Sequence, residues 1–157
     1  MSLVSEIRLI RETIKTRIED HLGEDIENVI VGSKDKAHNF NPPFIWVIPA
    51  DSQINDEGLA LHEQWDLIFW IISIVNPGRD FDPDDARAEA ETLALRASKS
   101  LMFDPATGKE DRHLNNLVTD ITRVGWSPGD SRVLNHDESL FGAGVQIKVK
   151  FVTEESE

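Results

Sequence analysis

The chain has 157 residues, of which 39% are hydrophobic, and its formal net charge is −13 from 29 acidic and 16 basic side chains. This length fits one domain spanning residues 1–157, and we expect its end, residues 154–157, to be frayed. The absence of cysteine excludes disulfides, thiol catalysis and thiolate metal sites. An acidic surface repels phosphate backbones and anionic lipids, so we expect neither sequence-specific nucleic-acid binding nor membrane docking.

The beginning of the chain predicts one helix and one short strand. Apolar residues recur every three or four positions across residues 5–22, at Ile7, Ile10, Ile14, Ile18 and Leu22. This spacing is typical of one stripe of an amphipathic helix, and Gly23 follows where a helix C-cap is expected. Residues 28–31 predict a short strand, and residues 33–43, which end in two prolines, predict a loop.

Two further strands have apolar residues on both faces. Residues 44–48 are apolar throughout, and residues 68–75 are apolar apart from Ser73. Because a strand sends alternate side chains to opposite faces, both faces of these strands need cover. We therefore predict a central strand over residues 61–75, preceded by a polar loop over residues 51–61.

A second helix is well marked at its start. Asp82 is a typical N-cap residue, and Pro83 fits the first helical position, where its missing N–H costs nothing. The inward stripe of this helix consists of Ala86, Ala90, Leu93, Ala94, Ala97 and Leu101. Since alanine is small, the helix can lie close to a sheet, and we expect it to end near Phe103.

The last third of the chain predicts two strands separated by polar segments. Residues 106–116 predict a loop, residues 117–126 a strand, and residues 127–130 a turn that contains proline and glycine. Residues 131–139 are polar and expected to be exposed. The final strand alternates cleanly, with Val145, Ile147, Val149 and Phe151 on one face.

This order of elements predicts an α+β fold. We expect two layers, with a mostly antiparallel sheet of about five strands and two helices packed on one face. If both helices cover one face, the apolar residues on the other face of strands 44–48 and 68–75 remain exposed. A large exposed apolar patch usually marks an interaction site, so the pattern predicts self-association or a protein partner.

Motifs for catalysis or metal binding are weak. Asp80, Asp82, Asp84 and Glu91 imitate the spacing of an EF-hand loop, but Asp85 stands where that loop needs glycine. Helix capping explains these acids more simply. The five histidines form no pair four residues apart, and no nucleophile or phosphate-loop motif occurs. We therefore expect no catalytic residue, cofactor or metal, although a metal site assembled across loops stays open.

One aromatic residue stands apart from the others. Trp126 ends a predicted strand beside an exposed turn, between Arg123 and Arg132. Aromatic and arginine side chains are enriched at protein interfaces. We therefore predict a subunit contact that involves Arg123, Trp126, Arg132 and Phe141.

The order of elements resembles the tail terminator, or tail-completion, proteins of long-tailed bacteriophages and prophages. The likeness lies in the helix over 5–22, the strand 44–48 after a proline-rich loop, the helix 82–103 and the closing strand 145–152. The resemblance implies a structural protein with no enzymatic activity, which forms a ring, commonly a hexamer. Such a ring caps the tail tube and joins it to the head connector, which would place the protein in the host cytoplasm and in the virion.

Two other functions stay open on sequence grounds. One is a metal-dependent hydrolase that uses clustered Asp and Glu with a loop histidine. The other is a small cytoplasmic adaptor that binds a basic partner. The start of the chain has no apolar run after a basic segment, and the longest apolar run is far below the ~20 residues of a membrane helix. These two observations predict a cytoplasmic protein whichever of these functions holds.

Overall fold

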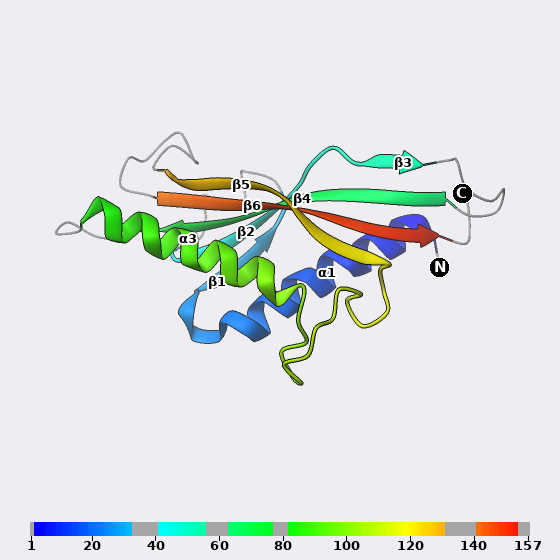
Figure 1. Cartoon of the computed structure of the whole chain (residues 1–157), viewed down its shortest axis with the longest axis horizontal. Coiled ribbons are helices and arrows are strands. Elements are labelled where there is room, and N and C mark those ends of the chain that lie inside the picture. Colours follow the sequence, from blue (N-terminus) through cyan, green and yellow to red (C-terminus); the bar gives the residue numbers. More distant parts are fainter. Residues whose placement is uncertain (1, 33–40, 56–62, 77–81, 131–140, 154–157) are drawn as a thin grey trace.

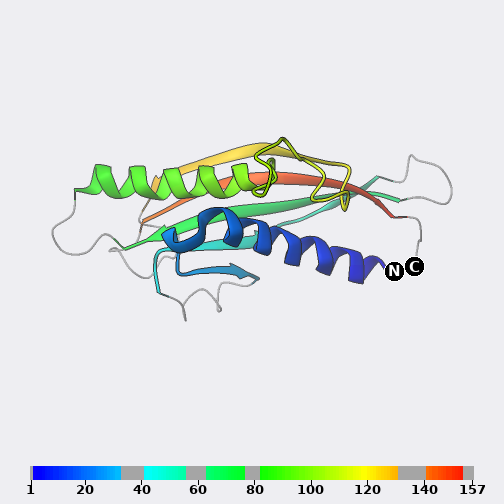
Figure 2. The same ribbon diagram turned by 90° about the horizontal axis from the view of Figure 1, so that it is seen from below.

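The computed structural model describes residues 2–32, 41–55, 63–76, 82–130 and 141–153. In these residues two helices, α1 (Leu3–Leu22) and α3 (Pro83–Ser100), lie on one face of a six-stranded sheet (Figure 1, Figure 2). A short 3₁₀ helix (Gly23–Asp25) follows α1. The predicted α+β fold, with a mostly antiparallel sheet and two helices packed against it, is confirmed.

The sheet is built around its two longest strands. Its strands are β1 (Asn28–Val31), β2 (Phe44–Pro49), β3 (Gln53–Asn55), β4 (Glu63–Val75), β5 (Asp120–Asp130) and β6 (Phe141–Thr153). The order is β1-β2-β4-β6-β5, and the short β3 also pairs with β4. Only β1 and β2 run parallel. The central strand β4 pairs with β6 along its whole length, which leaves β5 as an edge strand of the described sheet.

Helix α3 begins where the sequence predicts, whereas α1 begins two residues before the predicted start, at Leu3. The side chain of Ser2 accepts a hydrogen bond from the N–H of Ser5 at the start of α1, and Asp82 accepts one from the N–H of Asp84 at 2.9 Å. Gly23 ends α1 with a φ of 53°, a conformation that glycine adopts at little cost. In α3 every residue of the predicted inward stripe is buried, including Ala90, Ala94 and Ala97 at 0% exposure.

The main core lies between the helices and one face of the sheet. Ile10, Ile14 and Ile18 of α1 are fully buried there. The opposing side chains alternate along the strands, with Leu67, Phe69 and Ile71 from β4 and Val145, Ile147, Val149 and Phe151 from β6. The face predicted to be apolar in the last strand is therefore the one that packs on the helices.

The other face of the sheet is not the open apolar surface that the sequence predicts. Ile30, Phe44, Trp46 and Ile74 are each at most 4% exposed there, and Ile48 and Ile72 pack partly buried against them. These residues face one another across β1, β2 and β4, since Ile30 pairs with Trp46 and Phe44 with Ile74. They form a second apolar cluster on this face, separate from the main core. The prediction of an exposed patch at this place is therefore wrong for Phe44, Trp46 and Ile74.

Strand boundaries differ from the prediction in three segments. The segment 51–61 contains the short strand β3, and β6 begins at Phe141 instead of Val145. Strand β5 begins at Asp120 instead of Leu117 and continues to Asp130 through the predicted turn 127–130. Pro128 is tolerated in β5 because an edge strand need not donate every N–H, and the pairing is irregular between Ser127 and Asp130. The predicted polar segment 131–139, most of the loop 33–43 and the end 154–157 lie outside the described residues.

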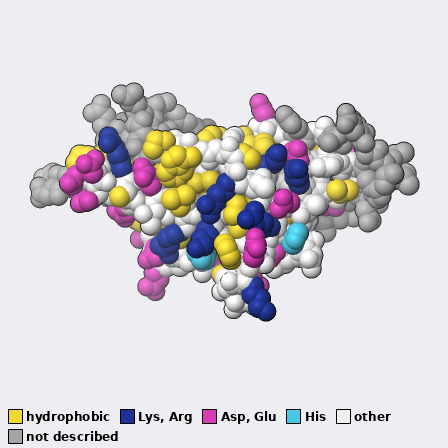
Figure 3. Space-filling model, in the orientation of Figure 1, with side chains coloured by type: hydrophobic (Ala, Val, Ile, Leu, Met, Phe, Trp, Pro, Cys, Tyr) yellow, Lys and Arg dark blue, Asp and Glu magenta, His cyan; other side chains and the backbone are white. Residues whose placement is uncertain are grey.

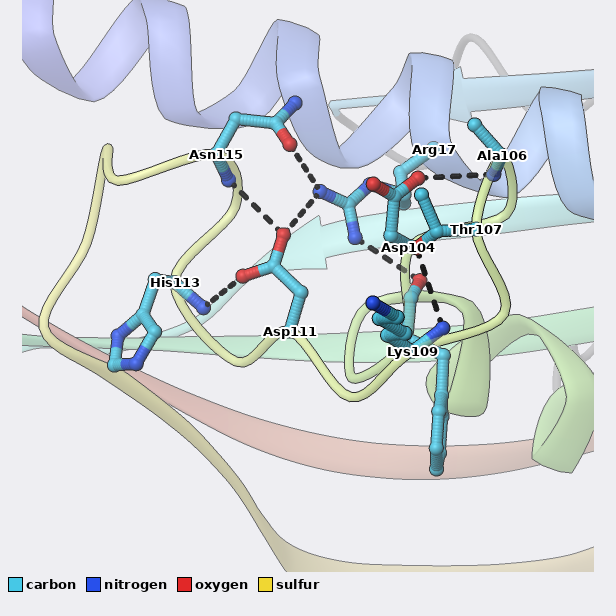
Figure 4. Close-up of polar contacts among 9 residues, drawn as sticks. Arg17, Asp104, Ala106, Thr107, Lys109, Asp111, His113 and Asn115 are labelled. Atoms are coloured by element: carbon cyan, nitrogen blue, oxygen red, sulfur yellow. Dashed lines mark hydrogen bonds and ion pairs between the residues drawn. The ribbon is translucent and has the colours of Figure 1, made fainter.

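A buried arginine joins α1 to the segment that leads from α3 to β5. Arg17 is 4% exposed and donates to the carbonyl of Phe103 (3.0 Å), to Oδ2 of Asp111 (3.0 Å) and to Oδ1 of Asn115 (3.2 Å) (Figure 4). The carboxylate of Asp111 also accepts from the N–H groups of His113 and Asn115. A charge can be buried only when it is paired and hydrogen-bonded, as it is here. This network holds the backbone in place at Phe103 and at Asp111, and therefore also at Arg112, the residue that follows Asp111.

Candidate interaction surface

The register of β5 decides where its side chains point. Arg123 lies opposite Ile147 and Trp126 opposite Val145, and both partners on β6 are core residues of the helix-covered face. Directly opposed residues project to the same face, so Arg123 and Trp126 lie on the side of the sheet that carries α3. The register shifts between Arg123 and Gly125, which makes Val124 the extra residue of a bulge.

Three large apolar side chains are exposed along this edge and on α3. Trp126 is 46%, Val124 47% and Leu95 42% exposed. Leu95 lies one helical turn before Lys99, on the side of α3 that faces away from the core. Single exposed apolar residues are ordinary, but an exposed tryptophan on an edge strand beside others is typical of a contact surface.

A basic hollow adjoins these apolar residues. It has a volume of about 430 Å³ and is lined by Lys99, Met102, Phe103, Arg112 and Arg123. The ammonium of Lys99 lies 5.5 Å from the centre of the Phe103 ring. Hydrophobic side chains and a group of Lys and Arg side chains lie side by side on this face (Figure 3). We call Leu95, Lys99, Arg112, Arg123 and Trp126 together the α3–β5 surface. Val124 follows Arg123 along the strand, opposite Gln146 at the bulge, and projects to the other side of the sheet.

Two basic side chains near the end of α3 act on His21 of α1. Burial lowers the pKa of His21 below its ordinary value of 6.5, and the positive charges of Arg96 and Lys99 lower it further. Arg96 is itself paired with Asp25 at 2.8 Å, whereas Lys99 takes part in no ion pair among the described residues. Lys99 is therefore the side chain at the end of α3 that can pair with an anion of a partner.

Replacing Lys99 with glutamine should raise the pKa of His21 toward 6.5, because one of the two positive charges that disfavour the imidazolium is removed. The rise should be partial, since burial and Arg96 still act to lower the pKa. A titration of the His21 ring protons by NMR measures this change. Lys15→Gln on α1, which is not among the causes of the shift, provides the control, and an equal rise in both variants would contradict the assignment.

The four predicted contact residues have different positions in the structure. Arg123 and Trp126 are exposed and lie on the α3–β5 surface. Phe141 is 6% exposed and belongs to the main core, opposite Val75, so it offers almost no surface to a partner. Arg132 lies outside the described residues. The predicted contact did not include Leu95, Lys99 or Arg112. The four-residue spacing of Leu95 and Lys99 on the polar side of α3 could have indicated that these two side chains share one exposed face.

Neither a metal cluster nor a membrane span is found in the described part of the chain. Within these residues no group of three or more His, Asp or Glu side chains could hold a metal ion. None of the described helices is both long and apolar enough to cross a membrane. No protein-family model matches the sequence, and no curated protein matches it.

Proposed function

We propose that this protein is a structural assembly protein whose copies associate into a ring, in the manner of a phage or prophage tail terminator. The observation that carries the proposal is Trp126, which is 46% exposed on edge strand β5. Val124, at 47%, is exposed on the other side of the same edge strand. Burying such side chains against a second polypeptide removes apolar surface from water. The tail tube and the head connector, as further partners of the ring, follow from the resemblance in element order.

The fold supports this proposal in a second way. An edge strand presents backbone donors and acceptors that another chain can pair with, and monomeric proteins usually blunt such edges with charge, proline or bulges. Strand β5 has a bulge at Val124 and Pro128 near its end, but its exposed side chains include two apolar residues. The bulge limits open-ended sheet growth, which favours a side-chain contact of defined geometry.

Light scattering coupled to size exclusion should detect a single oligomer whose mass is a multiple of 17.7 kDa. The double variant Val124→Ser, Trp126→Ser should dissociate at concentrations at least ~10-fold higher than the wild type, because apolar area is lost from the contact. The matched control is Ile54→Ser, Val152→Ser, which removes two equally exposed apolar side chains, at 52% and 48%, away from β5. A wild-type protein that stays monomeric at several hundred micromolar would contradict the proposal.

A further inference from the structure

The exposed side of helix α3 is divided by charge along its length. Its first turn contains Asp84 and Asp85, both exposed, and Glu89 follows one turn later. Its last turns contain Arg96 and Lys99. At a rise of 1.5 Å per residue, the positions of Asp84 and Lys99 are about 22 Å apart along the helix. One helix therefore presents an acidic start and a basic end on a single subunit.

The basic end is larger than the helix alone. Arg112 and Arg123 lie with Lys99 around the hollow of about 430 Å³, and Met102 and Phe103 form its apolar part. Arg112 pairs with Glu110 at 2.8 Å, but Lys99 and Arg123 form no ion pair among the described residues. As far as the structure describes the chain, the hollow therefore provides two cations without an ion-pair partner beside apolar surface, which fits a carboxylate-bearing segment of a protein partner.

The acidic start of α3 is similarly available. Asp84 is 89% exposed, and its one ion pair in the described residues, with Arg87 at 3.7 Å, is solvent-exposed at both ends. Exposed pairs of this kind contribute little free energy, so the carboxylate can exchange its partner at small cost. The N–H groups of this helical turn favour negative charge at the same place.

We propose that the α3–β5 surface binds the acidic start of α3, Asp84 and Asp85, of a second copy of this chain. This proposal rests on the proposed function and specifies its contact. Lys99 and Arg123 receive the carboxylates, while Leu95 and Trp126 pack against the apolar side of the incoming segment. A second copy is the partner whose charge pattern matches, because each subunit presents both the basic and the acidic half of the contact.

The position of the two halves on different parts of one subunit has a consequence for symmetry. When each subunit binds one neighbour with its basic end and another with its acidic start, the contact is heterologous and generates a closed ring if the rotation between neighbours closes. An antiparallel pair of α3 helices would exchange both halves within a dimer, so the measured mass separates the two arrangements. Since both halves are charged, the contact also orients the subunits as they approach.

A charge exchange tests the contact. Variant A carries Lys99→Glu and Arg123→Glu, and variant B carries Asp84→Lys and Asp85→Lys. In each variant alone, like charges face each other, and we expect association to weaken by on the order of 100-fold. An equimolar mixture of A and B pairs opposite charges again at every contact, as does a chain that carries all four substitutions. Light scattering should detect wild-type masses in both of these samples.

Two controls make the comparison specific. Arg8→Glu with Lys15→Glu changes the net charge as variant A does, on exposed positions of α1, and should assemble like the wild type. Far-ultraviolet circular dichroism checks that every variant keeps its helices. If variant A loses its helical signal, the neutral pair Lys99→Gln, Arg123→Gln replaces it, and its association should still weaken by about 10-fold.

The outcomes separate this inference from the proposed function. If variants A and B, each measured alone, assemble at the same concentration as the wild type, the contact is overturned and the ring proposal stands. The same conclusion holds if each variant loses assembly and the mixture does not recover it. Recovery in the mixture with a mass of only two subunits would support the contact and contradict the ring. A wild-type protein that is monomeric at every concentration would overturn both.

Discussion

Replacing Phe69 with alanine should lower the free energy of unfolding by about 3–5 kcal/mol, the range found for phenylalanine removed from a packed core. Phe69 lies in the middle of β4, is 1% exposed, and pairs with Pro49 on one side and Ile147 on the other. Both neighbouring strands hold it in place, so the structure cannot collapse easily into the space that the ring leaves. Urea denaturation followed by circular dichroism, at one fixed protein concentration, measures the loss.

Trp126→Ala is the matched comparison. Trp126 is also an aromatic residue of a strand, but it is 46% exposed, and we expect its removal to cost less than about 1 kcal/mol of subunit stability. It should instead weaken association. Equal stability losses in the two variants would show that Trp126 belongs to the core and would remove the support that it provides for a contact surface.

Replacing Asp111 with asparagine should cost about 2–3 kcal/mol of stability at pH 7, because the guanidinium of Arg17 stays buried and loses its charged partner. Arg17 is 4% and Asp111 19% exposed, and their nearest atoms are 3.0 Å apart. The exposed pair of Arg112 and Glu110 is the control, and Glu110→Gln should change stability by less than about 0.5 kcal/mol. Urea denaturation of both variants beside the wild type provides the comparison.

The effect of Asp111→Asn should also depend on pH. Burial acts to raise the pKa of the Asp111 carboxyl, but hydrogen bonds from the N–H of His113, from Arg17 and from the N–H of Asn115 outweigh it and hold the pKa below 3.8. A carboxyl whose pKa is lower in the folded state stabilises the fold above its unfolded pKa, and this contribution is lost as the pH falls through the folded pKa. The stability difference between wild type and variant should therefore be constant between pH 5 and 7 and shrink below about pH 4. A difference that grows on acidification would contradict the depressed pKa.

The same network links stability to the proposed contact. Arg17 holds the carbonyl of Phe103, and Asp111 precedes Arg112, so two residues that line the basic hollow depend on the buried ion pair. Asp111→Asn is therefore expected to weaken association as well as folding. The charge exchange on Lys99 and Arg123 should affect association alone, since both side chains are exposed.

Local patterns were sufficient to predict the helices and the core face of the last strand. The three- and four-residue spacing of Ile10, Ile14 and Ile18 and the alanine stripe of α3 correspond to buried residues, because a helix with one apolar side has one way to bury it. Alternation placed Val145 and Ile147 on the buried face of β6 for a similar reason, since the side-chain period of a strand is two.

Which surface stays open depended on how the strands are paired. The sequence alone predicted an exposed patch on the centre of the sheet, but Phe44, Trp46 and Ile74 are buried in a second apolar cluster with Ile30. The exposed apolar residues Val124 and Trp126 lie instead at the edge, because β5 is the last strand in the order. Strand order and register are set by contacts between distant segments, and no local pattern specifies them.

Composition was enough to predict the acidic character of the chain, and patterns among neighbouring residues were enough to predict the class of fold, the helical stripes and the caps at Gly23 and Asp82. The packing of distant segments brought Lys99, Arg112 and Arg123 together around one hollow, buried Arg17 against Asp111, and placed Phe141 in the core. These residues are far apart along the chain, and their proximity follows from the packing of α3, β5 and the segment between them, which composition and periodicity do not encode.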